Sequence, residues 1–263
     1  MPDKLYNTIS AVGEYVRLVA NVIAVSFKKL PSWNLLRDQF FNVGVGSLPV
    51  VAITGFSTGM VLAAQSFFQL NDKGLAAVTG LMVTKAMMVE LGPILTAFMV
   101  TGRVGSAMCA EIGTMKVTEQ LDALNSMSVN PLRYLLAPRI IAGIVMLPLL
   151  TVFSALTGVI GGYMVAVHIY GMAPNVFFDP LPINIHAFDF IMMMTKALVF
   201  GIIIVTVSCY QGLKTRGGAA GVGRSTTHSV VVCYCFILVV NFLLTVGLNS
   251  SYSYMKEVLN AWF

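Results

Sequence analysis

The sequence predicts an all-α polytopic membrane protein, in which an N-terminal interfacial amphipathic helix precedes five transmembrane helices. Composition, five long apolar runs and the placement of basic residues lead to this prediction. Of the 263 residues, 57% are hydrophobic and only 10% are charged, and the mean hydropathy is +0.83. Soluble domains carry roughly 25% charged residues. The composition therefore excludes an ordinary soluble domain, and the net charge of +5 reflects loop bias rather than binding to nucleic acid.

Five apolar runs each approach the roughly 20 residues that a helix needs to cross a bilayer. They are Ser47–Gln69, Leu75–Thr101, Ile140–Val167, Phe188–Gln211 and Ser229–Leu248. Three prolines lie inside these spans and predict kinks, which neighbouring helices can accommodate: Pro49, Pro93 and Pro148. The pairs Gly55-x-x-x-Gly59 and Gly158-x-x-x-Gly162 are candidates for close helix packing.

Residues 1–30 predict an amphipathic helix in the membrane interface. Apolar residues recur in steps of three and four from Leu5 to Leu30, whereas Glu14, Arg17 and Lys28 fall on another side. A helix packed on its own membrane domain is the alternative. Pro31 ends the pattern, and residues Trp33–Phe41 predict a short elbow with interfacial aromatic residues.

Lysine and arginine concentrate on one side of the predicted membrane. The region through Val43 carries five, residues 102–139 carry four, and Gly212–Thr227 carries three, whereas the opposite side has only Lys73 and Lys256. This excess of twelve basic residues against two predicts a cytoplasmic N-terminus and a C-terminus on the other side of the membrane.

Gly102–Arg139 is the longest polar interval in the chain. Within it, Ala107–Met127 has no proline and predicts a helix. Because this segment carries Glu111, Lys116, Glu119 and Asp122, it cannot lie in lipid. We expect it on the cytoplasmic side, either gripped by a soluble partner or simply solvated.

Three charged residues lie inside predicted spans. Glu90 lies 15 residues after the start of its span at Leu75, about 22 Å along a helix and near the middle of the bilayer. A carboxylate there costs about 2.5–3.5 kcal/mol. Lys85 and Lys196 enter to roughly 12–15 Å, and Lys85 points about 140° away from Glu90. These charges indicate either a cavity for a ligand with apolar tails and a charged head, or structural hydrogen bonding and snorkelling lysines.

Motifs of nucleotide and metal chemistry do not occur: there is no Gly-Lys dipeptide and hence no P-loop, and no H-E-x-x-H. The G-x-S-x-G pattern matches Gly55-Phe-Ser-Thr-Gly59, but this segment lies inside the first predicted span and not at the strand-to-helix turn that the motif requires. Cys233-x-Cys235 lacks a partner pair, so we expect no metal site and free, buried cysteines. Ser225–Thr227 are expected to cap the fifth span. The sequence predicts a chain that is not an enzyme and holds no cofactor.

Several blocks of the sequence resemble the MlaE/YrbE permease family over roughly residues 40–250. In chain order they are Glu90-Leu-Gly-Pro93, Gly102-Arg-Val-Gly105, Ala110-Glu-Ile-Gly-Thr-Met115, Val117-Thr-Glu-Gln120, Asp122-Ala-Leu124, Asn130-Pro-Leu-Arg133, Ala137-Pro-Arg139, Leu147-Pro-Leu149 and Gly221-Val-Gly-Arg-Ser-Thr-Thr227. The resemblance implies the permease subunit of an ABC transporter that moves phospholipid between the inner and outer membranes of bacteria.

The resemblance also implies partners and a membrane. They are a second copy of the chain in a homodimer, a cytoplasmic ABC ATPase that binds ATP and Mg, often a small STAS-domain protein, and a periplasmic MCE-domain protein. The chain would lie in the bacterial inner membrane with its C-terminus in the periplasm. It would comprise N-terminal interfacial and elbow helices (1–43), a transmembrane permease domain (44–250) with a coupling helix within 102–139, and a periplasmic tail (251–263).

Site residues follow from the same resemblance. Polar positions near an outward-opening lipid cavity match Gln65, Lys85, Glu90 and Lys196, and candidates for contact with the ATPase are Arg103, Glu111, Lys116, Glu119 and Asp122. Relatives often carry arginine before the glutamate of the E-L-G-P block, whereas this chain has Val89. The alternative function is an ion-coupled secondary carrier or channel that uses Glu90, Lys85 and Lys196 as a relay.

Overall fold

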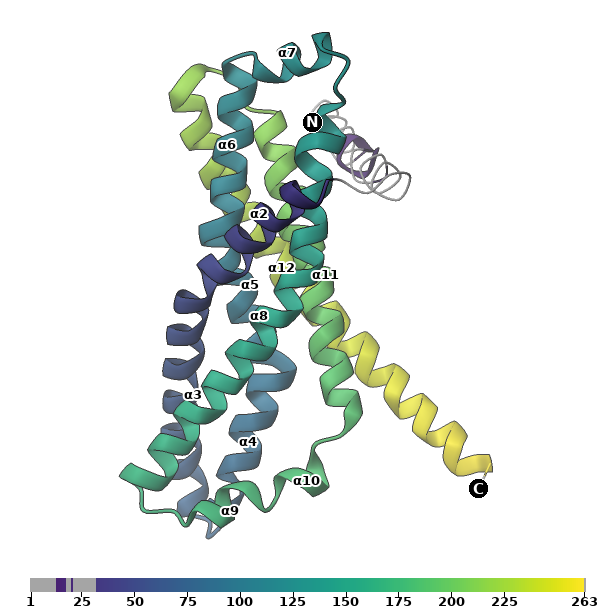
Figure 1. Cartoon of the computed structure of the whole chain (residues 1–263). Coiled ribbons are helices and arrows are strands. Elements are labelled where there is room, and N and C mark those ends of the chain that lie inside the picture. Colours follow the sequence, from purple (N-terminus) through teal and green to yellow (C-terminus); the bar gives the residue numbers. More distant parts are fainter. Residues whose placement is uncertain (1–12, 18–19, 21–31, 263) are drawn as a thin grey trace, which may run out of the picture. The chain divides into compact units, whose positions relative to one another are not determined.

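The computed structural model describes residues 13–17, 20 and 32–262, with side chains through Tyr254. Within these ranges all regular structure is helical (Figure 1). The interfacial helix predicted for residues 1–30 lies almost entirely outside the described residues.

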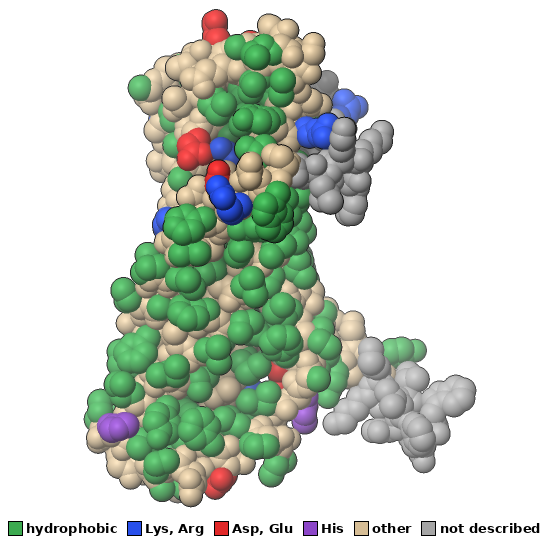
Figure 2. Space-filling model, in the orientation of Figure 1, with side chains coloured by type: hydrophobic (Ala, Val, Ile, Leu, Met, Phe, Trp, Pro, Cys, Tyr) green, Lys and Arg blue, Asp and Glu red, His purple; other side chains and the backbone are tan. Residues whose placement is uncertain are grey.

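Five helical segments are long and apolar enough to cross a membrane. They are Trp33–Asn71, Ala76–Val117, Leu132–Ile169, Ala187–Leu213 and Gly218–Tyr254. The prediction of five spans is therefore confirmed, and each segment extends beyond the apolar run that predicted it. Hydrophobic side chains cover most of the visible surface of α3 (Leu48–Asn71) and α8 (Ala137–Met164), as lipid-facing helices require (Figure 2).

Most spans are built from several consecutive helices. The first contains α2 (Trp33–Val43), η1 (Val45–Ser47) and α3; the second contains η2 (Ala76–Val78), α4 (Thr79–Ala86), η3 (Met87–Leu91), α5 (Gly92–Val100), η4 (Thr101–Gly105) and α6 (Ser106–Val117). The third contains η5 (Leu132–Leu136), α8 and η6 (Val165–Ile169). The fourth is α11 (Ala187–Leu213) and the fifth lies in α12 (Gly218–Trp262), while the short helices α7 (Gln120–Ser126), α9 (Pro174–Phe178) and α10 (Leu181–Asn184) lie in connections.

The chain divides into two compact units. Unit 1 consists of Met1–Ser47, Val100–Met146 and Gly201–Cys233, and unit 2 consists of Leu48–Met99, Leu147–Phe200 and Tyr234–Phe263. Because these stretches alternate along the chain, every long segment contributes residues to both units. The three basic regions of the sequence fall in unit 1.

Small residues bring α3 and α8 into backbone contact within unit 2. A Cβ added at Gly55 would lie 2.6 Å from the Ser154 carbonyl oxygen, and one at Gly59 would overlap the Gly158 carbonyl. A Cβ at Gly162 would meet the Val83 side chain at 2.7 Å. The two Gly-x-x-x-Gly pairs are therefore packing positions, as predicted, since a side chain there would force the helices apart.

Close packing in unit 1 involves side chains. A Cβ at Gly113 of α6 would meet Thr215 Oγ1 at 2.9 Å, and one at Gly143 of α8 would meet Val205 Cγ2 of α11 at 2.5 Å. Three of the four cysteines are buried as predicted: Cys109, Cys209 and Cys233. The burial predicted for Cys235 is wrong, because this thiol is exposed on α12.

Two predicted elements differ from the structure. The single helix expected over Ala107–Met127 is two helices, α6 and α7, because Glu119 takes a left-handed conformation with φ of 61°. Left-handed backbone cannot continue a right-handed helix, and α7 turns away from the axis of α6 (Figure 1). The cap expected at Ser225–Thr227 is also wrong, because α12 begins at Gly218 and Thr226 donates within it to the Val222 carbonyl.

Candidate functional site: a charged cluster within the membrane spans

The Glu90-Leu-Gly-Pro93 block places a free carbonyl beside a carboxylate. Pro93 has no N–H, so it cannot donate to the carbonyl of Val89 four residues earlier, as the α-helical pattern requires. The chain widens here into the π-helical turn η3, which contains both Val89 and Glu90. Such turns expose backbone groups and often mark functional positions.

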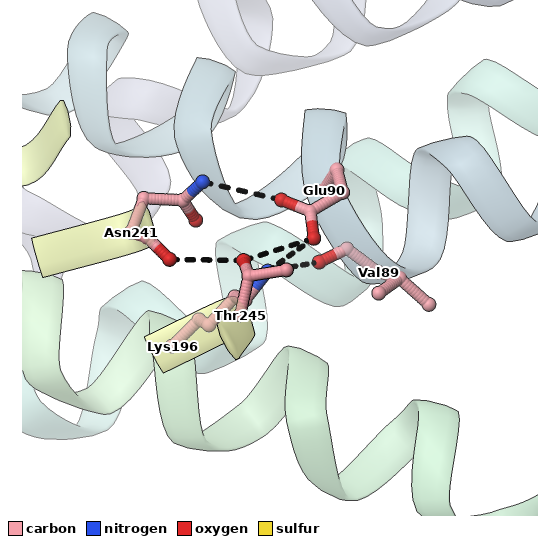
Figure 3. Close-up of polar contacts among 5 residues, drawn as sticks. All are labelled: Val89, Glu90, Lys196, Asn241 and Thr245. Atoms are coloured by element: carbon pink, nitrogen blue, oxygen red, sulfur yellow. Dashed lines mark hydrogen bonds and ion pairs between the residues drawn. The ribbon is translucent and has the colours of Figure 1, made fainter. Parts of the chain in front are cut away.

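Lys196 of α11 supplies the donor that Pro93 lacks. Its Nζ donates to the Val89 carbonyl at 2.9 Å and to Glu90 Oε1 at 2.7 Å (Figure 3). The Lys196 side chain has no exposed surface, whereas Glu90 retains 34%. The snorkelling considered for this lysine is therefore wrong: the ammonium is buried and paired within unit 2.

Two residues of α12 complete the cluster. Asn241 Nδ2 donates to Glu90 Oε2 at 3.2 Å, and Thr245 Oγ1 donates to Glu90 Oε1 at 3.0 Å. They lie four residues apart and therefore share one helix face. We call Glu90, Lys196, Asn241 and Thr245 the Glu90 cluster (Figure 3).

The cluster is polar and incompletely satisfied. A carboxylate only accepts hydrogen bonds, so the Asn241 amide nitrogen must face Glu90 and its Oδ1 must point elsewhere. That oxygen is buried and has no hydrogen-bond partner among the described residues. Because an unsatisfied buried acceptor costs about 1–3 kcal/mol, it favours a ligand that carries a donor.

The other residues predicted at the lipid cavity lie apart from this cluster. Lys85 Nζ lies 3.8 Å from Asp189 Oδ2, at the start of α11. Gln65 is exposed on α3 and, among the described residues, forms no hydrogen bond with the Glu90 cluster. The prediction that Lys85 and Glu90 do not pair is confirmed.

The five residues predicted for ATPase coupling lie in unit 1, in and around α6 and α7. Arg103 Nη1 donates to the Asn42 carbonyl and to Ser47 Oγ, each at 3.0 Å, and thus ties the segment before α6 to the end of α2 and to η1. Lys116 Nζ lies 3.6 Å from Asp122 Oδ2 across the bend between α6 and α7.

The acidic residues of this region are exposed. Glu111 Oε2 accepts from Arg139 Nη2 at 2.7 Å, and its side chain remains 62% exposed while that of Arg139 is 7% exposed. Glu119 and Asp122 are exposed at the bend and on α7. Carboxylates in this position can contact a soluble partner.

Two charged residues of these networks are not among the site residues predicted from the sequence. Asp189 was not singled out, although an acidic residue in the first turn of a helix is a known stabilising pattern. Its Oδ2 accepts from the His186 N–H at 3.0 Å. Nothing local in the sequence indicates that the guanidinium of Arg139 reaches Glu111.

Five apolar spans with an internal ion pair define the class of this chain: it is a multi-pass membrane protein. The family model described as Permease MlaE matches residues 36–247. The chain belongs to the MlaE permease family.

Similar proteins agree with this membership. A probable ABC transporter permease protein of Rickettsia conorii is 38% identical over 256 residues, which cover 92% of this chain and 97% of the relative. Another from Synechocystis is 40% identical over 208 residues, 79% of each chain. The chloroplast protein TRIGALACTOSYLDIACYLGLYCEROL 1 of Arabidopsis thaliana is 36% identical over 213 residues, 81% of this chain and 61% of the relative.

The chain is therefore a non-catalytic permease subunit of an ABC transporter. Such a permease works with a separate ATPase subunit, so the alternative of a self-sufficient ion-coupled carrier or channel is not retained.

Proposed function

We propose that this permease moves phospholipids between the inner and outer membranes of a bacterium, driven by ATP hydrolysis in its partner. The observation that carries the proposal is the Glu90 cluster, a charged and hydrogen-bonding site within spans whose other side chains are mostly apolar. A lipid needs this combination, because its headgroup is polar and its tails are not. The name of the Arabidopsis relative, which is that of a galactolipid, also supports a lipid substrate.

The chemistry of the cluster suggests how a headgroup would bind. Glu90 and the unpartnered Asn241 Oδ1 are acceptors, suited to an ammonium or hydroxyl of the headgroup. Lys196 is a donor to a phosphate once it leaves Glu90. We propose that Glu90 and Lys196 line the lipid path; the places of Gln65 and Lys85 in it stay predictions.

Coupling to ATP hydrolysis is proposed through α6 and α7. The ATPase, which holds ATP and Mg, would contact exposed Glu119 and Asp122 and move the bend between these helices. Arg103, Glu111 and Lys116 would hold this bend against its own unit through their contacts with Asn42, Arg139 and Asp122.

The remaining organisation is also proposed. The permease would be a homodimer in the bacterial inner membrane, with residues 1–43 in the cytoplasmic interface, a permease domain over 44–250, and residues 251–263 in the periplasm. The basic regions, all in unit 1, support a cytoplasmic N-terminus. The exposed apolar side chains of α12, such as Phe242 and Leu243, support a second copy as a neighbour. An MCE-domain protein and a STAS-domain protein would complete the complex.

Lipid transfer between reconstituted vesicles tests the substrate. The complex of permease and ATPase is placed in one vesicle population, and transfer of a fluorescent phospholipid to acceptor vesicles is followed with and without ATP. We expect ATP-dependent transfer, and at least a tenfold loss for Glu90→Gln, which keeps the shape but removes the charge. Asp72→Asn, an exposed acid in the connection after α3, is the matched control. Equal transfer without ATPase, or wild-type transfer by Glu90→Gln, would overturn the proposal.

Co-purification tests the coupling surface. Reversing Glu119 and Asp122 together to lysine should strongly reduce the ATPase recovered with the tagged permease, because both side chains are exposed and charged. Reversal of Asp38, an exposed acid on α2, serves as the control. Unchanged recovery of the ATPase by the double variant contradicts the coupling role.

A further inference from the structure

An apolar groove of about 370 Å³ lies in unit 2, and none of the residues that line it belongs to the Glu90 cluster. Its walls come from four parts of the unit: α4 with η3, α8, α9 and α11. The lining surface is entirely apolar. This volume is within the range of about 300–1,000 Å³ of small-molecule sites.

The groove follows one face of α8. Its lining residues on this helix recur in steps of three and four: Val152, Ala155, Leu156, Val159, Ile160 and Tyr163. Eleven residues separate the first from the last, about 16 Å of helix. The hydrocarbon core of a bilayer is about 30 Å thick, so the groove has the length of one leaflet.

An ion pair borders the groove. Thr84 and Phe190 line the groove. Lys85 follows Thr84 and Asp189 precedes Phe190 in the sequence, and Lys85 Nζ lies 3.8 Å from Asp189 Oδ2. The Lys85 side chain is 43% exposed and that of Asp189 is 13% exposed. Lys85 therefore offers an accessible cation between α4 and α11.

The ion pair lies toward the Tyr163 end of the groove. A Cβ at Gly162 would contact Val83, and one at Gly158 would contact Met87, so α4 and η3 run antiparallel to α8. Lys85, midway between Val83 and Met87, is level with residues near Ile160. From there the apolar stripe continues to Val152, eight residues or about 12 Å deeper.

We infer that this groove binds one acyl chain of a glycerophospholipid, whose phosphate contacts Lys85. A transmembrane helix is a poorer fit, because it is about 10–12 Å across and would need far more space than 370 Å³. A phosphate beside Lys85 gains a charge-assisted hydrogen bond, and a cationic headgroup amine would lie near Asp189. The chain would then enter between Leu156 and Ile160, which are 58% and 56% exposed.

This lipid site shares no residue with the Glu90 cluster and differs from the proposed transport site in what it requires. Lys196 and Glu90 satisfy each other and take no part in the groove. The inference needs a phospholipid bilayer but no transport, so it holds even if the transported molecule is another lipid.

Native mass spectrometry of the permease–ATPase complex, extracted from nanodiscs of phosphatidylethanolamine and phosphatidylglycerol, tests the inference. The phospholipids retained per permease chain are counted. Leu156→Trp and Ile160→Trp fill the groove, and each should remove one retained phospholipid per chain. Leu149→Trp, at another exposed position of α8 (57%), is the matched control and should keep the wild-type count. The Glu90→Gln variant should also keep this phospholipid, which separates the groove from the transport site.

The headgroup contact is tested at Lys85. Lys85→Gln should weaken retention of phosphatidylglycerol about tenfold, measured as the lipid lost during graded activation in the spectrometer, and Lys85→Arg should restore it. Wild-type retention in both tryptophan variants of the groove would overturn the inference. So would release of a partner subunit rather than a phospholipid, which would show that a protein helix covers this face.

Discussion

Units 1 and 2 each contain an acid–base pair with a 2.7 Å contact and a buried base, and the two pairs differ in how far the acid is exposed and in how many donors it has. In Glu111–Arg139 of unit 1, the acid is 62% exposed and accepts a hydrogen bond from the arginine side chain. In Glu90–Lys196 of unit 2, the acid is 34% exposed and accepts from three side chains. Water supports the charge in the first pair, whereas protein donors replace water in the second. Water can therefore replace the lost contact in unit 1, whereas in unit 2 the loss of one partner leaves the other without water to replace it.

The largest expected loss of stability follows the removal of one partner of the ion pair in unit 2. Glu90→Leu leaves the fully buried ammonium of Lys196 with only the Val89 carbonyl, and removing one partner of a buried pair costs about 3–5 kcal/mol. We expect a large fall in thermal stability and loss of lipid transfer. Thermal unfolding of the purified complex, followed by intrinsic fluorescence, measures the first effect.

The double variant Glu90→Leu with Lys196→Met sharpens this comparison. It removes both charges, so stability should return to near wild type while transfer stays lost. If the double variant is as unstable as Glu90→Leu, the instability does not come from an unpaired ammonium.

A smaller loss of stability is expected from substituting alanine for a glycine at a helix contact, and we again expect the larger loss in unit 2. In Gly59→Ala the new methyl group overlaps the Gly158 backbone, which cannot rotate away, at a cost of about 1–3 kcal/mol. In Gly113→Ala of unit 1 the methyl group meets the Thr215 side chain at 2.9 Å, which can shift. Thermal unfolding should show a clearly larger loss for Gly59→Ala, and equal losses would contradict this account of the packing.

Breaking the pair in unit 1 should cost still less. Glu111→Gln keeps an acceptor oxygen beside Arg139 on a side chain that water already reaches, so we expect a loss of about 1 kcal/mol. Urea unfolding at two salt concentrations measures it, with Glu119→Gln as the control, because Glu119 is exposed and forms no ion pair among the described residues. A loss as large as that of Glu90→Leu would remove the distinction between the two pairs.

The smallest effect concerns Glu14 and Lys214, an exposed pair in unit 1. The hydrogen bond from Lys214 and its charge lower the pKa of Glu14 below its ordinary value of 4.5, and Glu14 raises the pKa of Lys214. A lowered carboxyl pKa contributes stability above the ordinary value, which is lost as the pH falls through the lowered one. The raised pKa of Lys214 contributes stability that is fully present below its ordinary value of 10.5, and this stability is lost as the pH rises through the raised value.

Hydrogen–deuterium exchange of residues 13–17 measures this contact. At pH 7, Glu14→Gln should exchange slightly faster than the wild type, and the difference should vanish once acidification protonates Glu14. Identical exchange of the two proteins at pH 7 would show that the pair does not hold this segment.

Much of the fold could be predicted because a bilayer imposes simple rules on the sequence. Five apolar runs gave five spans, and the glycine pairs gave the contact of α3 with α8. The ends of the helices were harder to predict. The break at Glu119 needs a left-handed backbone, and no glycine or proline in the sequence indicates it. Helix α12 begins eleven residues before the predicted start at Ser229, because Gly218–His228 is helical without being strongly apolar.

Membrane crossing, the number of spans and the buried charges were determined by the sequence itself, because the cost of exposing polar groups to lipid depends mainly on local composition. Only the tertiary structure decided which charges meet. Lys196 reaches Glu90 and Val89 across more than a hundred residues, while Lys85, five residues from Glu90, turns to Asp189. Helix rotation and packing choose such partners, and these depend on every neighbouring side chain rather than on spacing along the chain.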